Sequence, residues 1–344
     1  MSTTMVSVTY GNRWHLLQQT LRAALDAGAA YAVVVDNGSA DDIAALVQRA
    51  FPGRASTICM ERNEGPAAGF RKGIELAISQ GAKYLFLLDD DNCVEPGAVT
   101  VLRKTFETLR ATVQEDNLCV LGFRPDRQPD ILKGKPQDPI GESVNGFFGF
   151  HVKDLPRKIW GRRPGIRPGS HMARAVPEDR LFRQRVAPFG GLFFHRALIG
   201  RYGYPDARFI LYCDDIDFSY RITSGGGEIW LAPAARIVDV EQSWSLGEDR
   251  MTAFGRWIKQ GSDRQVFYTA RNWSYFESHC RGCSWFRLVN RTIYLSILWC
   301  TAMRARKATR FKLILEAIRD GERGVLGVRP EFPLLSVKRQ ALTA

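Results

Sequence analysis

The stretch Tyr84-Leu85-Phe86-Leu87-Leu88-Asp89-Asp90-Asp91-Asn92 decides the fold of this chain. It begins with an apolar and aromatic run too short for a separate helix, so it predicts a strand buried on both faces in a parallel sheet. Three carboxylates follow the strand directly. Because ligands bind at the carboxyl ends of strands in open α/β sheets, the stretch predicts a ligand site. An acidic turn in solvent is the alternative, since aspartate is a common turn residue.

The carboxylates after this strand suit a divalent cation. Asp89 and Asp91 lie on the same side of an extended turn, where their oxygens are hard ligands for Mn2+ or Mg2+. A diphosphate could supply the remaining ligands. The stretch therefore favours a metal site that also binds a phosphorylated molecule.

The composition narrows the class of partner. The chain has 344 residues and a formal net charge of +12, which indicates nucleic acid, an acidic membrane surface or a phosphorylated small molecule. No apolar run reaches the about 18 residues of a membrane span, and no signal-peptide pattern is present, so we expect a cytoplasmic location. The 7 cysteines are irregularly spaced, and the single Cys280/Cys283 pair does not favour a zinc site.

The N-terminal part alternates strands and helices. Apolar periodicity predicts strands at 5–9, 31–35 and 56–60, a helix at 14–27, and a second helix that continues from the glycine-spaced loop 62–73. This order predicts a right-handed parallel layer with its loops at one edge.

The loops at that edge together suit a nucleotide. Asp36 could accept a hydrogen bond from a base or ribose, and the amides near Gly65 and Gly69 could approach phosphate oxygens. Arg71 could add positive charge. Neither the dinucleotide fingerprint nor a GxxxxGK[ST] loop is present, which disfavours a hydride-transfer enzyme or an NTPase.

These motifs resemble a known family. The first strand with its loop, Val35-Asp36-Asn37-Gly38-Ser39, the loop Asn63 to Phe70, and Leu88 to Asp91, in this order, look like the donor half of inverting GT-A glycosyltransferases of family 2. The likeness is greatest to bacterial galactofuranosyl- and rhamnosyltransferases. It covers roughly residues 5 to 110 and resumes at about 185.

The resemblance implies an α/β fold. This would be a Rossmann-like, mostly parallel nucleotide-binding sheet flanked by helices, with a C-terminal helical extension. We predict a GT-A domain at 1–265, made of a donor half (1–122), a variable loop (123–185) and an acceptor half (186–265), followed by a helical, membrane-associating region at 266–344. The implied donor-binding residues are Thr9, Tyr10, Arg13, Asp36, Asn37, Asn63, Gly65, Gly69, Arg71 and Asp90.

The variable loop gives few structural signals. Pro, Gly, Lys and Arg are frequent in it, and only Val144 to Val152 predicts a strand. The basic run Arg157 to Arg163 could bind lipid head groups or an acceptor diphosphate, or it could be a solvated loop.

A second acidic cluster lies in the predicted acceptor half. Val186 to Arg196 predicts a strand broken at Gly190-Gly191, and Asp214, Asp215 and Asp217 then start a helix. Carboxylates cap helix starts, yet three exceed what one cap needs. The family has the same acidic spacing followed by an arginine, which implies Asp215 as general base, with support from Asp214 and Asp217 and a brace from Arg221.

The resemblance also implies further ligands. The family's metal-binding histidine falls at Asp239, which is itself an acceptable hard ligand; Glu241 could replace it, or the third ligand could be missing. Tyr268 to Asn272 resembles a family helix element in which Arg271 could reach a phosphate or remain a surface cation. Trp244 could give an apolar face to a sugar or belong to the core. The implied acceptor-binding residues are Gly190, Gly191, Arg221, Trp244 and Arg271.

The C-terminal helix region has two open interpretations. Ile293 to Met303 is apolar nearly all round and is followed by several cations. It could be a buried helix, or it could lie in a membrane interface, peripheral on the inner face of the cell membrane.

The sequence favours transfer of a sugar, galactofuranose or rhamnose, from a UDP or dTDP donor to a glycan or lipid-linked acceptor. Its alternatives are a sugar-nucleotide nucleotidyltransferase and a basic nucleic-acid-binding protein. No nucleic-acid recognition motif is present, so we expect no nucleic-acid partner. The sequence does not indicate the oligomeric state.

Overall fold

The computed structural model describes residues 2–128, 131, 145–154, 180–241, 253–280 and 285–334. Its strands are β1 (Thr3–Gly11), β2 (Tyr31–Ser39), β3 (Ala55–Cys59), β4 (Tyr84–Asp89), β5 (Asn92–Val94), β6 (Leu118–Phe123), β7 (Phe182–Gln184), β8 (Leu192–His195) and β9 (Glu228–Asp239).

The helices are α1 (Trp14–Asp26), α2 (Ile43–Ala50), α3 (Pro66–Ser79), α4 (Ala98–Leu109), α6 (Ala197–Tyr202), α7 (Asp214–Ser224), α8 (Ala253–Lys259), α9 (Asp263–His279), α10 (Trp285–Arg304) and α11 (Ala308–Glu322). A 3-10 turn, η2, covers Val152–Asp154.

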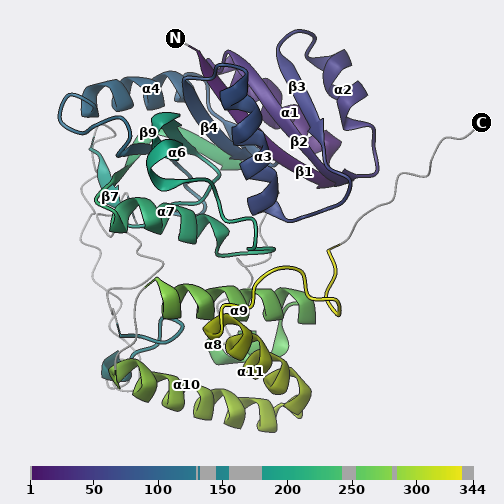
Figure 1. Ribbon diagram of the computed structural model, residues 1–344, viewed down its shortest axis with the longest axis vertical. Coiled ribbons are helices and arrows are strands. Elements are labelled where there is room, and N and C mark those ends of the chain that lie inside the picture. The colour runs from purple at the N-terminus through teal and green to yellow at the C-terminus, as the bar shows by residue number, and fades with distance from the viewer. Residues whose placement is uncertain are drawn as a thin grey trace, which may run out of the picture.

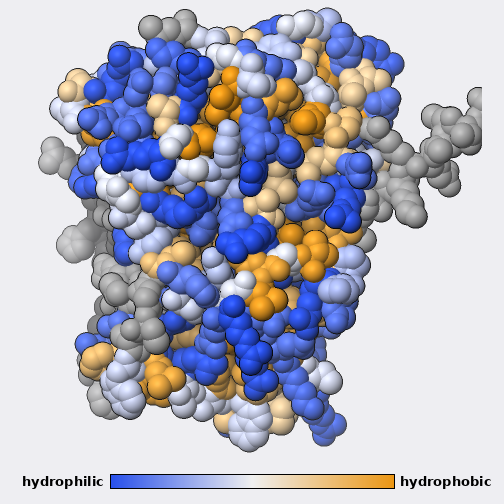
Figure 2. Space-filling view, in the orientation of Figure 1, coloured by the Kyte–Doolittle hydropathy of each residue, from blue (hydrophilic) through white to orange (hydrophobic). Residues whose placement is uncertain are grey.

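Figure 1 shows two parts, one above the other. The upper part holds the sheet with its flanking helices, and the lower part consists of α8 to α11. On the face in Figure 2, hydrophilic residues predominate and hydrophobic residues form separate patches between them. The arrangement of the elements makes the chain a mixed α/β protein with a helical C-terminal part.

The centre of the sheet is the predicted strand β4. Strands β3, β2, β1 and β4 lie side by side and run parallel, which confirms the parallel N-terminal layer. Residues Tyr84 to Leu88 are all 0% exposed, so the apolar run is buried on both faces of the sheet. Because β1, β2 and β4 are parallel, the loops that follow them meet at one edge.

The other half of the sheet contains strands of both directions, while most strands of the whole sheet run the same way as β4, as the sequence predicted. Strand β8 lies between β4 and β6 and is antiparallel to both. The reason lies at Gly191, whose amide donates to the Leu87 carbonyl at 2.8 Å. The chain thus enters β8 beside the carboxyl end of β4 and has to run back along it.

Two glycines let α3 lie directly on the sheet. A Cβ at Gly69 would be 2.5 Å from Cγ1 of Val8, and a Cβ at Gly73 would be 2.4 Å from Cγ1 of Val6. These distances are shorter than side-chain contacts allow, so only glycine permits this packing. The close approach fixes the start of α3 beside the end of β1.

The predicted strand at Val144 to Val152 is wrong. Phe147 and Phe150 form an isolated bridge around a tight turn, in which Phe148 and Gly149 have φ of 50° and 67°. Extended backbone cannot include such angles. The aromatic residues of this turn pack against α10 in the lower part, where the ring centroid of Phe147 lies 5.4 Å from that of Tyr294.

The lower part begins with α8 and α9. Helix α9 starts with a capping box, in which the Ser262 hydroxyl accepts from the amide of Gln265 and the Gln265 side chain accepts from the Ser262 amide. A domain boundary at 265/266 falls inside the first turn of this helix. Within the described residues, α8 shares its hydrophobic cluster with α9, α10 and α11.

Helix α10 has two different faces. Tyr294, Leu298 and Ala302 are buried against the other helices, while Trp285 and Trp299 are 71% and 51% exposed. One face therefore belongs to the core, and the opposite face has no cover within the described residues. None of the described helices is both long and apolar enough to cross a membrane.

Candidate active site

A cavity of 360 Å³ lies where β1, β2 and β4 end. Its upper wall comes from these strands and the loops after them, and its lower wall comes from the loop before α7, the start of α9 and the C-terminal segment. The lining residues are Val8, Tyr10, Arg13, Asn37, Asn63, Pro66, Phe70, Asp89, Asp90, Asp91, Arg127, Leu211, Tyr212, Arg264, Gln265 and Leu334. Both parts of the molecule thus contribute to one cavity.

Asp90 organises the strand end. Its carboxylate accepts a hydrogen bond from the Thr9 hydroxyl at 2.8 Å and from Nε of Arg13 at 2.9 Å. The Thr20 hydroxyl donates to the Asp90 carbonyl at 2.9 Å. Burial raises the pKa of Asp90, although Arg13 and Thr9 act in the opposite direction. Thr9 and Arg13 are therefore brought to the site by their bonds to Asp90.

Asp89 and Asp91 lie on either side of this anchor. Nη1 of Arg124 is 3.5 Å from Oδ2 of Asp89, and Nη2 of Arg13 is 3.4 Å from Oδ2 of Asp91. Burial raises the pKa of both carboxyls, and the charge of Asp89 raises that of Asp91 further. Each carboxylate thus has a guanidinium nearby but no bidentate partner.

Gly190, which the resemblance implied as an acceptor-binding residue, lies against this strand end. A Cβ at Gly190 would be 2.2 Å from Oδ1 of Asn92 and 2.6 Å from Oδ2 of Asp89. Only a glycine fits there. Gly191, with φ of 103°, has the structural role of starting β8.

Asp239 does not fit as a third metal ligand. Its Oδ1 accepts from Nη2 of Arg124 at 2.6 Å and from Nδ2 of Asn92 at 3.0 Å, and its Oδ2 accepts from Nε of Arg127 at 2.6 Å. Glu241, the alternative ligand, is paired with Arg13 at 2.6 Å. In the part of the chain that the structure describes, no three His, Cys, Asp or Glu side chains are grouped to hold a metal ion. Of the expected ligands, Asp89 and Asp91 remain.

The acidic start of α7 follows two strained residues. Tyr212 and Cys213 have φ of 65° and 66°, in the left-handed region that such side chains rarely adopt. Nδ2 of Asn272, on α9, donates to the carbonyls of Leu211 at 2.7 Å and Tyr212 at 3.0 Å. Helix α9 therefore stabilises the turn from which α7 begins.

Asp214 and Asp215 lie close enough to Asp89 for their charges to interact. Burial raises the pKa of Asp215 to about 6, and the Asp89 charge adds to the shift. Burial and then the charge of Asp215 raise the pKa of Asp214 well above its usual range. Oδ2 of Asp214 is buried without a hydrogen-bond partner in the described structure. The two acidic clusters therefore form one group.

Asp217 and Arg221 support the helix and do not line the cavity. Nε of Arg221 donates to Asp217 at 3.1 Å, and its two terminal nitrogens donate to the carbonyls of Tyr202 and Tyr204 at 2.7 and 3.0 Å. These bonds engage the whole guanidinium fork. Arg221 is thus the brace that the sequence implied, which corrects its assignment to acceptor binding.

Arg271 is not placed at the cavity. Its side chain is 2% exposed, its Nη1 donates to the Gly327 carbonyl, and its guanidinium lies 4.8 Å from the Tyr268 ring. Burial lowers the pKa of Arg271 to about 10. Arg271 ties α9 to the C-terminal segment, which corrects the expected phosphate contact. Trp244 lies outside the described residues.

Several expected donor residues have structural partners instead. Arg71 is exposed, pairs with Glu75 at 2.9 Å and does not line the cavity. Oδ1 of Asp36 accepts from the Ser39 amide at 2.8 Å. The Gly65 amide donates to Oδ1 of Asn63 and the Gly69 amide to the Gly65 carbonyl, so neither is free for a phosphate.

Asn37 and Asn63 do reach the cavity. The Asn37 side chain donates to the Gly65 carbonyl at 3.0 Å and accepts from the Glu64 amide at 2.9 Å, which orders the loop before α3. Tyr10 lines the same wall, with its ring 5.5 Å from the Arg13 guanidinium.

Sequence reasoning missed three arginines of the site. Arg124 and Arg127 follow β6, and Arg264 lies in the first turn of α9. A signal existed for the first two, because an unbroken apolar run at 118–123 leads into them. No local signal marks Arg264, whose position depends on how the lower part docks.

Part of the chain matches a known protein family. Residues 5–165 match the family model described as Glycosyl transferase family 2. The match covers just under half of the chain. It includes the Asp89–Asp91 strand end and stops before α7. No curated protein matches the sequence significantly.

Two solved structures are similar to this chain. A crystal structure of GalNAc-T7 with UDP, GalNAc and Mn2+ has a TM-score of 0.51 at 15% identity, covering 80% of this chain and 49% of that chain. A crystal structure of S. aureus TarS 1-349 has a TM-score of 0.47 at 12% identity, covering 93% and 92% of the two chains. The first shows a GT-A-like fold, although the chain spans about half the length of that neighbour, and the second carries no argument. The family match and the GT-A-like fold agree with each other.

Proposed function

We propose that the protein is an inverting glycosyltransferase that moves a sugar from a nucleoside-diphosphate donor to a hydroxyl of an acceptor. The observation that carries this proposal is the electrostatic contact between the Asp89 strand end and the acidic start of α7, next to a cavity of 360 Å³. A site for two substrates needs such a pair of differently placed carboxylate groups, one at the donor and one at the acceptor.

The donor would enter along the ends of β1 and β2. Asn37 and Asn63 line this wall beside Tyr10, which offers a ring face to the base. Arg13, Arg127 and Arg264 line the same cavity, and guanidinium groups bind phosphate oxygens through paired hydrogen bonds. This arrangement supports binding of a nucleoside diphosphate.

Asp215 is the proposed base. Its carboxylate takes the proton of the acceptor hydroxyl while that oxygen attacks the anomeric carbon from the face opposite the diphosphate. A new C–O bond forms, the bond from the anomeric carbon to the diphosphate breaks, and the diphosphate leaves with the electron pair. A pKa of about 6 leaves most of Asp215 ionised at neutral pH yet basic enough to accept a proton. Asp214 and Asp217 hold the start of α7 in place for it.

Asp89 and Asp91 are the residues that would hold the expected Mn2+ or Mg2+, because Asp239 is engaged by arginines. A metal held by Asp89 and Asp91 would supply Lewis-acid stabilisation of the leaving diphosphate. We propose UDP or dTDP as the nucleotide, with galactofuranose or rhamnose as the favoured sugar and a glycan or lipid-linked acceptor, on the strength of the sequence resemblance.

A screen of sugar nucleotides tests this function. UDP- and dTDP-sugars are added singly with Mn2+, Mg2+ or EDTA, and the melting temperature and the release of nucleoside diphosphate are measured. A true donor raises the melting temperature by mass action and is turned over when an acceptor is present. If no sugar nucleotide shifts the melting temperature, the proposal fails.

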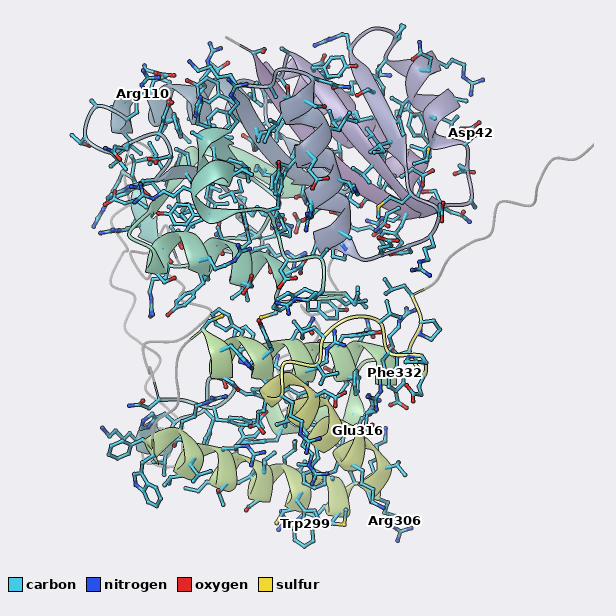
Figure 3. The ribbon with its side chains drawn as sticks, viewed as in Figure 1. Asp42, Arg110, Trp299, Arg306, Glu316 and Phe332 are labelled. Atoms are coloured by element: carbon cyan, nitrogen blue, oxygen red, sulfur yellow. The ribbon has the colours of Figure 1, made fainter. Side chains whose placement is uncertain are left out.

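We further propose peripheral association with an anionic membrane through the outer face of α10. Trp285, Leu288 and Trp299 are exposed there, and Arg306 and Lys307 follow the helix. Trp299 and Arg306 point away from the body of the molecule in Figure 3. Tryptophans beside cations are typical of helices that lie in a membrane interface.

Flotation with vesicles of anionic lipid tests this association. The wild-type protein should float with the vesicles at low salt and be released at high salt, since charge attraction is screened. The substitution Arg306→Glu should weaken flotation, while Arg110→Glu, at the opposite end of the molecule in Figure 3, should not. Equal flotation of both variants would refute the proposed face.

A further inference from the structure

Asp239 joins two arginines at the edge of the cavity. Its Oδ1 accepts from Nε and Nη2 of Arg124 at 2.9 and 2.6 Å, and its Oδ2 accepts from Nε of Arg127 at 2.6 Å. The Asp239 side chain is 6% exposed, so this carboxylate is nearly removed from water. A buried carboxylate with both oxygens engaged by guanidinium groups is an anchor for those groups.

The two arginines have different orientations. Arg124 is 8% exposed and extends to Asp89, with Nη1 3.5 Å from Oδ2. Arg127 is 29% exposed, uses only Nε on Asp239 among the contacts found in the described residues, and lines the cavity. Within the described residues, Asp239 therefore holds Arg127 by its inner nitrogen, and the terminal nitrogens remain for a ligand.

Arg127 is part of a cationic lining. Arg13 lines the same cavity from the loop after β1 and Arg264 from α9, and Arg13 bridges Asp90 and Asp91 at 2.9 and 3.4 Å. The planar guanidinium fork matches two phosphate oxygens at once, which a carboxylate cannot do without a bridging cation. The cationic side chains thus lie where the resemblance implies a metal with a third protein ligand.

We infer that Asp239 is not a metal ligand but a positioning residue, and that it presents Arg127, next to Arg13, as the binding group for the donor diphosphate. This inference rests on the proposed function. It assigns the charge neutralisation of the diphosphate to arginine side chains of this chain. Nucleotide binding then does not require a divalent cation.

Calorimetric titration of the full-length protein with UDP and with dTDP tests the inference. Wild-type protein is measured in EDTA and in Mn2+, beside the variants Arg127→Ala, Asp239→Asn and Asp239→His and the control Arg49→Ala. Arg49 is an exposed arginine on α2, away from the cavity. Melting temperatures without nucleotide show which variants are folded.

The expected result is that the wild type binds UDP or dTDP in EDTA, and that Arg127→Ala weakens this binding about 10- to 100-fold, the loss of charge-assisted hydrogen bonds. Asp239→Asn weakens it less, because the amide oxygen can still accept from one guanidinium. Asp239→His loses binding in EDTA, since a histidine cannot anchor two arginines. Arg49→Ala binds as the wild type does.

Two results would overturn the inference. The first leaves the proposed function intact, and the second refutes both. If nucleotide binds only with Mn2+, and Asp239→His retains that binding while Arg127→Ala equals the wild type, Asp239 is a metal ligand and the proposed function stands. If folded wild-type protein binds neither nucleotide in either condition, the inference and the proposed function both fail. Should Arg127→Ala unfold, Arg127→Lys replaces it, because one ammonium cannot make the paired contact and has to show the same loss.

Discussion

At the scale of single residues, the site depends on carboxyl groups whose charges are held near one another. Asp215 has a pKa raised to about 6 by burial, and Asp89 and Asp214 share its surroundings. Such a group is costly to ionise in the folded protein. Function requires the ionised form, whereas stability favours the neutral form, so the two properties should respond to pH in opposite directions.

The raised pKa of Asp215 determines how the stability of the protein changes with pH. The folded-state pKa of Asp215 lies above the ordinary value of 3.8, so the folded protein binds its proton more tightly than the unfolded chain does. Stability associated with this group is present at low pH and is lost as the pH rises through about 6. Asp215→Asn should raise the free energy of unfolding by about 1–3 kcal/mol at about pH 8 and change little at about pH 4. Urea unfolding at both pH values measures this; equal effects would contradict the raised pKa.

Gly190 gives a second prediction at this scale. A Cβ there would meet Asn92 and Asp89 at 2.2 and 2.6 Å, so Gly190→Ala should displace the strand end and lower transfer by about 100-fold. Gly200→Ala is the matched control, because a Cβ at Gly200 meets nothing within 4 Å. Initial rates of both purified variants test this, and a fully active Gly190→Ala would show that the contact tolerates a methyl group.

At the scale of elements, sequence patterns predicted what local periodicity determines. Helix α1 was expected at 14–27 and covers Trp14–Asp26, and β4 ends at the predicted acidic residue. Helix α2 has Ile43, Leu46 and Val47 at helical spacing, but it was missed because its 8 residues are fewer than periodicity needs to mark a helix clearly. The sequence predicts a strand around Phe148 because closely spaced aromatic residues are typical of strands. In the structure these residues form a turn and pack on α10.

Helix α9 illustrates an element whose role only the structure reveals. The Tyr268 to Asn272 motif implied a phosphate contact by Arg271. In the structure Asn272 is the residue of this motif that acts near the site, because it donates to the carbonyls before α7. The sequence could not show this, because the partner carbonyls of Leu211 and Tyr212 lie about 60 residues away along the chain. The motif therefore positions the proposed base from a distance.

Asn272→Ala should loosen the strained turn at Tyr212. Two buried carbonyls lose their donor, which should cost about 1–3 kcal/mol of stability. Because the change lies behind α7, kcat should fall and its pH profile should shift, while the Kd for the nucleotide stays near the wild-type value. Melting curves, nucleotide titration and rates across pH measure the three effects. A variant that is merely less stable, with an unchanged pH profile, would limit Asn272 to a structural role.

At the scale of the whole molecule, the cavity lies where the sheet meets the helical part. Asp89 to Asp91 come from the sheet, whereas Arg264, Gln265 and Leu334 come from the helical part. The sequence predicted the acidic sheet edge because it follows directly from β4. It could not predict the cationic wall, since the position of Arg264 depends on docking across the molecule and that of Arg127 on its bond to Asp239.

The central claim is that Asp215 takes the proton of the acceptor, and one comparison tests it most directly. Transfer by Asp215→Asn is measured beside transfer by Asp42→Asn, a conservative change at the exposed cap of α2, which does not line the cavity. We predict that Asp215→Asn lowers the rate of transfer about 100- to 10,000-fold with the Kd for the donor nucleotide unchanged, while Asp42→Asn transfers at the wild-type rate. Transfer by Asp215→Asn at the wild-type rate would contradict the account.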